Sequence, residues 1–299
     1  MFLQQIINGL TVGAVYALIA LGYTMVYGVL ELINFAHGEI YMIGAYLGII
    51  FLGILTVLGV TEYSIILSVL LTFILAVLFC SAYGFTIEKF AYKPLRKAAR
   101  LNPLISAIGV SIFLQNYVML SQGETDKVFP TLFKTSYIEF LNATMTTLQV
   151  FIFFSSLLLM LMLHLFVMKT RTGKAMRAVA QDKVMASLLG INVDRIISVT
   201  FIIGSGLAAV AGVMVAMYYG RVNYFIGYIA GIKAFTAAVL GGIGSIPGAM
   251  LGGFILGLIE SFGASYLSSE FKDAYAFIIL IIILLIKPTG LLGKTGDKP

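Results

Sequence analysis

Ionisable and amide side chains gather in one short stretch of an otherwise apolar chain. Glu31, Asn34, His37 and Glu39 lie within nine residues, and glycines flank the group. Such groups are costly at membrane depth, so they usually line a water-filled path or pair with one another. One interpretation is therefore a pathway lining or gate in a broken helix. The alternative is a short cytoplasmic loop whose charges face water, and no nearby basic residue decides between the two.

A second candidate lies in the glycine-rich stretch of residues 229–267, which is interrupted by the sequence GGIGSIPG. Gly242, Gly244 and Pro247 interrupt the helical hydrogen-bond ladder there. Backbone amides freed at the start of a half-helix could meet a carboxylate, which would make this segment part of a gate. A tight turn between two membrane spans is the other interpretation.

A cationic segment of 27 residues, Lys169 to Arg195, lies between two apolar blocks. It holds six basic residues against the two acids Asp182 and Asp194. We expect residues 172–190 to form a helix and a half, with Ala175, Met176, Val179 and Ala180 on one side. Such a helix can press into a groove on a soluble ATPase and transmit its motion, or it can lie against anionic headgroups.

Catalytic chemistry finds no support in the chain. The two histidines, His37 and His164, are far apart and lack zinc-site spacing. The tail sequence GLLGKT imitates a phosphate-binding loop, but two residues separate its glycines where that loop needs four. We therefore predict no catalytic residue, no metal site and no cofactor in this chain, and a frayed C-terminus.

Composition sets the fold class. The chain of 299 residues is 60% hydrophobic and 11% charged, with a mean hydropathy of +1.03. Only lipid can cover so much apolar surface, so we predict an all-α polytopic membrane protein. The net charge of +6 comes from basic residues clustered in two loops and the tail, as the positive-inside rule requires, so no nucleic-acid partner is implied. A single cysteine, Cys80, forms no disulfide within the chain.

Eight or nine spans follow from the apolar runs. The expected spans are residues 2–29, 40–60, 63–87, 101–121, 148–168, 196–219 and 273–286, with 229–267 as two short spans or one span plus a re-entrant hairpin. Three basic segments fall on the cytoplasmic side: residues 88–100, which include Lys97 and Arg100, the segment 169–195, and the tail with Lys287, Lys294 and Lys298. Residues 122–147, with Lys127 and Lys134, form the longest polar segment on the opposite face.

Three features in or beside the spans carry further expectations. Arg221 and Lys233 are expected near the outer interface, and Glu260 either bonds within the helix bundle or reaches that interface. Small residues recur every fourth position at Gly204, Ala208, Gly212 and Ala216, and in the pairs Gly248–Gly252 and Gly253–Gly257, a spacing that lets helices approach closely.

A faint internal echo suggests an inverted repeat. Met25, Tyr27 and Gly28, followed by Asn34 and Gly38, resemble Met217, Tyr219 and Gly220, followed by Asn223 and Gly227. In the expected topology the two helices that precede these motifs run in opposite directions.

Three stretches, residues 8–46, 171–196 and 234–253, resemble the permease subunits of bacterial branched-chain amino acid ABC importers. The NFAHGE and RAVAQD blocks within them are specific motifs. The similarity is to the first permease subunit of the leucine-transporter type. It implies a single permease domain, 1–299, with a cytoplasmic coupling loop, 169–195, in the bacterial inner membrane. It also implies four kinds of partner: the lipid bilayer, a second permease subunit, two cytoplasmic ATPase subunits that bind ATP and magnesium, and a periplasmic binding protein.

The resemblance makes residues 171–196 the coupling segment. Its candidate contact residues are Arg171, Lys174, Arg177, Ala180, Asp182, Ala186 and Gly190; Val184 stands where the family usually has an acid. Relatives that import urea or short amides leave the substrate open. The residues also allow a stand-alone secondary transporter using Glu31, Glu39 or Glu260 as an ion site, or a passive channel.

Overall fold

The computed structural model describes residues 1–96, 98–99, 101–130, 136–140 and 143–293. Several predicted positions lie outside the described residues: Lys97, Arg100, Lys134, Lys294 and Lys298.

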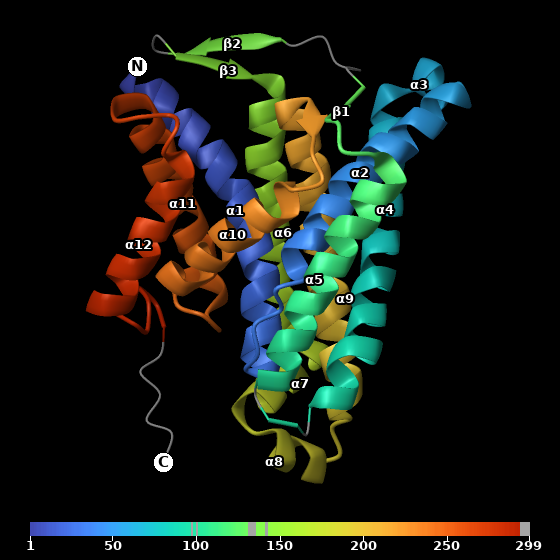
Figure 1. Cartoon of the computed structure of the whole chain (residues 1–299), viewed down its shortest axis with the longest axis vertical. Coiled ribbons are helices and arrows are strands. Elements are labelled where there is room, and N and C mark those ends of the chain that lie inside the picture. Colours follow the sequence, from blue (N-terminus) through green and yellow to red (C-terminus); the bar gives the residue numbers. More distant parts are fainter. Residues whose placement is uncertain (97, 100, 131–135, 141–142, 294–299) are drawn as a thin grey trace. The chain divides into compact units, whose positions relative to one another are not determined.

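Helices dominate the described chain (Figure 1). Within the described residues, seven helices are long and apolar enough to cross a membrane. They are α1 (Phe2–Leu30), α2 (His37–Val57), α4 (Ile65–Ile87), α5 (Leu101–Gln122), α6 (Thr147–Lys169), α9 (Val193–Tyr219) and α11 (Ile246–Tyr266). The prediction of an all-α polytopic membrane protein is confirmed, and the observed spans begin and end within a few residues of the predicted ones.

Shorter helices make up the rest of the helical structure in the described residues. α10 (Ile226–Gly241) and α12 (Lys272–Ile286) have 16 and 15 residues. The predicted break in residues 229–267 therefore separates a short helix, α10, from a full-length one, α11. The remaining helices are α3 (Val60–Tyr63), α7 (Arg171–Gln181), α8 (Lys183–Leu188), the π-helix η1 (Glu88–Tyr92) and the 3-10 helix η2 (Lys93–Leu95).

Two small β-ribbons were not predicted. β1 (Lys127–Val128) pairs antiparallel with β4 (Arg221–Val222). β2 (Tyr137–Phe140) pairs antiparallel with β3 (Ala143–Thr146), with Tyr137 opposite Thr146. The polar segment 122–147 thus contains short β-strands. Its irregular pattern of apolar and polar residues had not predicted them.

The residue contacts divide the chain into two compact units, which are described separately. The first unit contains Met1–Ile33, Ser136–Thr200 and Ile232–Pro299, and the second contains Asn34–Thr135 and Phe201–Gly231. The prediction of a single permease domain over 1–299 is not tested by this division.

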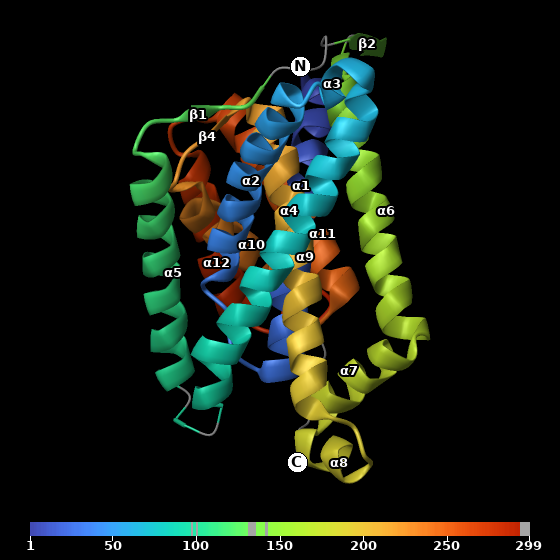
Figure 2. The same ribbon diagram turned by 90° about the vertical axis from the view of Figure 1, so that its right-hand side faces the viewer.

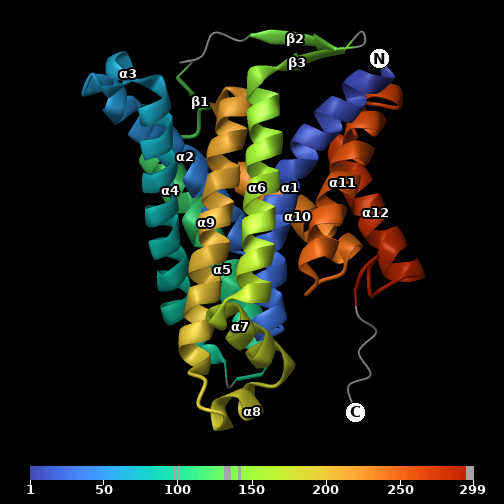
Figure 3. The same cartoon turned by 180° about the vertical axis from the view of Figure 1, so that it is seen from behind.

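Small residues hold α1 against α11 in the first unit (Figure 3). A Cβ atom on Gly253 would lie 2.5 Å from the Cα of Ala17, and one on Gly257 would overlap the backbone of Gly13. Helices without side chains at their crossing come close enough for many van der Waals contacts, which is the main attraction between helices in lipid. The close packing predicted from the small-residue spacing is confirmed here.

The second unit packs α2 and α4 against α9 in the same manner. A Cβ atom on Gly44 would lie 2.7 Å from the Cα of Ala209, and one on Gly84 would overlap Ser205. The hydroxyl of Ser81 on α4 also donates to the carbonyl of Ile202 on α9, at 3.1 Å.

The two motifs of the internal echo have similar local backbone conformations. Each helix is followed by a residue in the left-handed region, Glu31 with φ 61° and Gly220 with φ 69°. In each, an asparagine carbonyl then accepts the amide that opens the next helix: Asn34 from His37 at 3.0 Å, and Asn223 from Ile226 at 3.2 Å. Within the second unit the echo glycines meet, because a Cβ on Gly227 would lie 2.7 Å from the carbonyl oxygen of Gly38. The wider inverted repeat stays a prediction.

Candidate functional site

The predicted coupling segment begins with a sharp turn from α6 into α7 (Figure 2). The hydroxyl of Thr170 accepts a hydrogen bond from the Gly173 amide at 3.0 Å and so caps α7. A side chain at Gly173 would overlap the carbonyl groups of Phe166 and Val167, so this turn needs glycine. The predicted helix and a half is confirmed as α7 and α8, separated at Asp182.

One face of α7 is covered by the chain itself. Met176 and Val179, expected on its apolar side, are 4% and 1% exposed. The basic residues Arg171, Lys174 and Arg177 are exposed. The apolar side of α7 is therefore not the surface left open to a partner.

Three predicted coupling residues shape α8. A side-chain oxygen of Asp182 accepts from the amides of Val184 and Met185 at 2.8 and 3.0 Å, which caps the helix. Ala186 is buried. Gly190 ends the turn with φ 82°, a conformation that favours glycine.

Large apolar side chains of α8 and the residue that follows it are open to solvent. We call them the α8 face: Val184, Met185, Leu188 and Leu189, exposed by 70%, 57%, 77% and 80%. Sequence reasoning had noted Val184 only as a departure from the family pattern. The spacing i, i+1, i+4, i+5 places these residues on one side of a helix and was the signal that could have revealed the face.

A lysine of the same segment is tied to the end of α1. The Nζ of Lys183 donates to the carbonyl oxygen of Leu30 at 3.1 Å. Leu30 is the last residue of α1, where carbonyls lack helical partners and a cation is favourable. Glu31, the next residue, is exposed. Sequence reasoning had given Lys183 no role.

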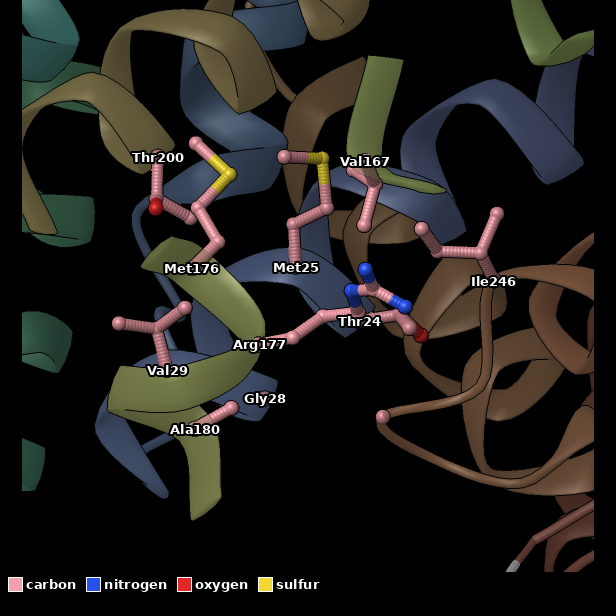
Figure 4. Close-up of a pocket in the computed structure, with 11 residues that line it drawn as sticks. Thr24, Met25, Gly28, Val29, Val167, Met176, Arg177, Ala180, Thr200 and Ile246 are labelled. Carbon is pink, nitrogen blue, oxygen red and sulfur yellow. The ribbon is translucent and has the colours of Figure 1, made fainter. Parts of the chain in front are cut away.

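A pocket of about 80 Å³ joins the two predicted groups of the first unit (Figure 4). Arg177 and Ala180 line it from α7, Thr24 and Met25 from α1, and Gly244 from the turn after α10. We call residues 242–247, which hold the predicted gate residues, the gate turn. The coupling residues Arg177 and Ala180 thus share one pocket with Gly244 of the gate turn.

The gate turn is fixed on both sides. Gly242 and Gly244 have φ 106° and 91°. The hydroxyl of Ser245 caps α11 by accepting from the Gly248 amide at 3.2 Å, and Pro247 lies in the first turn of that helix.

Residues near the C-terminus close α10. The amides of Leu291 and Leu292 donate to the carbonyls of Leu240 and Gly241, both at 2.9 Å. The predicted fraying is therefore wrong for this part of the tail, because these backbone bonds satisfy the last turn of α10.

Asn34, His37 and Glu39 belong to the second unit and are 2%, 1% and 1% exposed. A hydroxyl group donates to each of two: Tyr92 to Asn34 Oδ1 at 2.9 Å, and Ser111 to Glu39 Oε1 at 3.0 Å. The interpretation of a loop whose polar groups face water is wrong for these three residues, because the protein encloses them.

A buried ionic cluster in the first unit was also missed. Lys233 is 5% exposed, and its Nζ lies 2.8 Å from Glu260 Oε1 and 2.6 Å from Asp273 Oδ1. The Tyr16 hydroxyl donates to Glu260 Oε2 at 2.8 Å. Two carboxylates thus enclose Lys233 within the bundle, and its expected position near the outer interface stays a prediction. Glu260 bonds within the bundle, as one expectation had it.

No group of histidines, cysteines and carboxylates among the described residues could hold a metal ion.

Residues 5–285 match the family described as "Branched-chain amino acid transport system / permease component". The chain belongs to this family. It is 52% identical to the high-affinity branched-chain amino acid transport system permease protein LivH of Salmonella typhimurium, over 98% of this chain and 96% of that relative. It is equally similar to BraD, of the same description, from Pseudomonas aeruginosa, with the same coverage. A probable LivH of Methanocaldococcus jannaschii is 28% identical, over 94% of this chain and 89% of the relative. No solved structure matches the chain.

Proposed function

We propose that this permease component is one of two permease subunits of an ATP-driven importer for branched-chain amino acids in the bacterial inner membrane. Two cytoplasmic ATPase subunits bind ATP and magnesium and supply the energy. A periplasmic binding protein delivers the substrate, and a second permease subunit completes the path. The whole chain acts as one permease domain, with residues 169–195 as its coupling loop and its C-terminus in the cytoplasm.

The α8 face is the observation that carries this proposal. Four large apolar side chains stand exposed on a segment that also carries exposed arginine and lysine. Apolar patches with a polar rim mark interaction surfaces, and covering them is worth about 25 cal/mol per Å² of apolar area. A groove on an ATPase subunit is the occupant we propose.

Two contacts can carry motion from the ATPase into the bundle. Lys183 links the start of α8 to the end of α1. Arg177 and Ala180 of α7 share a pocket with Gly244 in the gate turn. A rigid displacement of α7 and α8 therefore reaches both the end of α1 and the turn between α10 and α11.

The test places charges on the α8 face. The double variant Leu188→Asp, Leu189→Asp, reconstituted with its partners in proteoliposomes, should lose ATP-driven leucine uptake at least tenfold and fail to co-purify with the ATPase subunits. The matched control Gln181→Glu adds a charge at an exposed position of the same segment and should keep both. Normal uptake and co-purification in the double variant would contradict the coupling role of the α8 face. Loss of binding to anionic vesicles alone, with uptake intact, would show that the face contacts lipid instead.

A stand-alone secondary transporter is the second candidate, and the burial of Glu39 favours it, because an enclosed carboxylate can act as an ion site. It predicts that the purified chain alone, in liposomes with an imposed pH or sodium gradient, accumulates substrate without ATP.

Competition of labelled leucine uptake by urea and acetamide tests the further alternative that the importer carries urea or short amides.

A further inference from the structure

We propose that Glu39 binds the ammonium group of the amino acid as it passes through the permease. This inference rests on the proposed function, and it names the residue that recognises one end of the substrate.

The carboxylate of Glu39 is only half satisfied. Its Oε1 accepts from the Ser111 hydroxyl at 3.0 Å, and the side chain is 1% exposed. Its Oε2 is buried and has no hydrogen-bond partner among the residues that the structure describes. An ionised carboxylate can accept up to four hydrogen bonds, so Oε2 has unused capacity to bind a donor.

The position of Glu39 is deep within the apolar part of its unit. Ser111 lies at the middle of α5, which runs from Leu101 to Gln122. A charged group at such depth is costly unless a partner compensates it. In the described part of the second unit no lysine or arginine forms an ion pair with Glu39. A cation that arrives with the cargo would supply the missing partner.

The neighbour of Oε2 fits one end of a zwitterion. A Cβ atom on Gly227 would lie 2.5 Å from Oε2, so only glycine leaves this space to the carboxylate. Gly227 is in the first turn of α10, where the helix dipole is positive. An amino acid bound there would have its ammonium on Glu39 and its carboxylate toward the start of α10.

A second polar group marks the direction of passage. Tyr46 lies seven residues after Glu39, which is two turns along the same face of α2, about 10 Å away. Tyr46 is 3% exposed, and its hydroxyl has no hydrogen-bond partner in the described ranges of the chain. Two enclosed polar groups with free capacity thus follow one face of a helix, which suits the polar end of a moving substrate better than a purely structural tie.

The competing role is structural, in which Glu39 only holds α2 to α5 through Ser111. Glu39→Gln separates the roles, because glutamine keeps the shape and the acceptor for Ser111 but removes the charge. In the complete importer, reconstituted with both permeases, the ATPases and the binding protein, we expect this variant to lose leucine uptake at least tenfold while the subunits still co-purify. The control Glu62→Gln changes an exposed glutamate on α3 and should leave uptake unchanged.

A second readout detects the ammonium directly. Tyr46→Cys in a Cys80→Ser background is labelled with a methanethiosulfonate reagent in the complete importer. Leucine should slow labelling, and 4-methylpentanoate, the same skeleton without the amine, should not; Glu39→Gln should abolish the protection. Leucine uptake by Glu39→Gln equal to that of the unmodified importer, or protection by 4-methylpentanoate equal to that by leucine, would overturn this inference. Neither result would affect the proposed function. Failure of the unmodified complex to import leucine with ATP would overturn the proposed function, and this inference with it.

Discussion

The ammonium group of Lys183 donates a hydrogen bond to the carbonyl oxygen of Leu30, at 3.1 Å. Lys183 opens α8, which carries the exposed apolar face, and Leu30 closes α1. α1 in turn lies along α11 through glycine contacts. This hydrogen bond thus connects the proposed ATPase contact to the helix pair α1 and α11 of the first unit.

Lys183→Met should uncouple the importer. Methionine keeps the length and apolar stem of the side chain but removes the donor that holds the end of α1, at a cost of about 1–3 kcal/mol for a charge-assisted bond. We expect ATP hydrolysis to continue while the amount of leucine imported per ATP falls several-fold in proteoliposomes. Lys183→Arg keeps a cationic donor and should restore most of the coupling. An unchanged ratio in Lys183→Met would show that this bond carries no motion.

Arg177→Glu combined with Ala180→Phe should abolish uptake. Ala180 lines the pocket of about 80 Å³ shared with Thr24 and Gly244, and phenylalanine overfills it. The reversed charge also removes a basic group from the exposed side of α7. The amount of the variant inserted in the membrane, measured by fractionation and immunoblotting, should stay normal, because neither position lies in a membrane span. Uptake of leucine into vesicles at the normal rate would argue against a coupling role for α7.

Lys233→Met should destabilise the chain more than a double variant that also neutralises its partner. The single change leaves the carboxylate of Glu260, 8% exposed as a residue, without its cation, and breaking a buried pair in this way costs about 3–5 kcal/mol. Lys233→Met with Glu260→Gln removes both charges of this pair and leaves only the part-exposed Asp273 carboxylate without its cation, so it should recover much of the loss. Thermal unfolding in detergent, followed by the exposure of Cys80 to a thiol dye, measures the order. A single variant as stable as the unmodified chain would show that the ion pair of Lys233 with Glu260 contributes nothing to stability.

Gly242→Ala should be more harmful than Gly244→Ala. Both glycines have positive φ, which costs a residue with a side chain about 1–2 kcal/mol. Gly244 has open space around it, whereas a Cβ on Gly242 would lie 2.6 Å from the Cα of Gly293. The same thermal unfolding assay should therefore rank Gly242→Ala below Gly244→Ala. Equal stability of the two variants would mean that the tail contact on Gly242 contributes nothing.

Sequence patterns predicted the spans and the close helix crossings well, because hydropathy and small-residue spacing act locally. The break at the GGIGSIPG sequence and the two helices of the coupling segment follow from the same local rules. The caps at Thr170 and Asp182 are also local, since each side chain reaches an amide two or three residues away.

Contacts between distant parts of the chain were not predictable from one sequence. Lys233, Glu260 and Tyr16 come from three helices, so no spacing rule links them. The ribbon between β1 and β4 joins residues almost one hundred positions apart, Lys127 with Val222. The burial of Glu39 was left undecided for a related reason: depth in the bilayer depends on which helices surround the segment, and its own residues carry no basic group to fix it.

Leucine uptake by the purified chain, alone and with its partners, tests the central claim most directly. In liposomes the chain alone should show no uphill accumulation under imposed pH or sodium gradients. Uptake should appear only when the second permease, the ATPase subunits, the loaded binding protein and ATP with magnesium are all present. Accumulation by the chain alone against a leucine gradient would contradict the account.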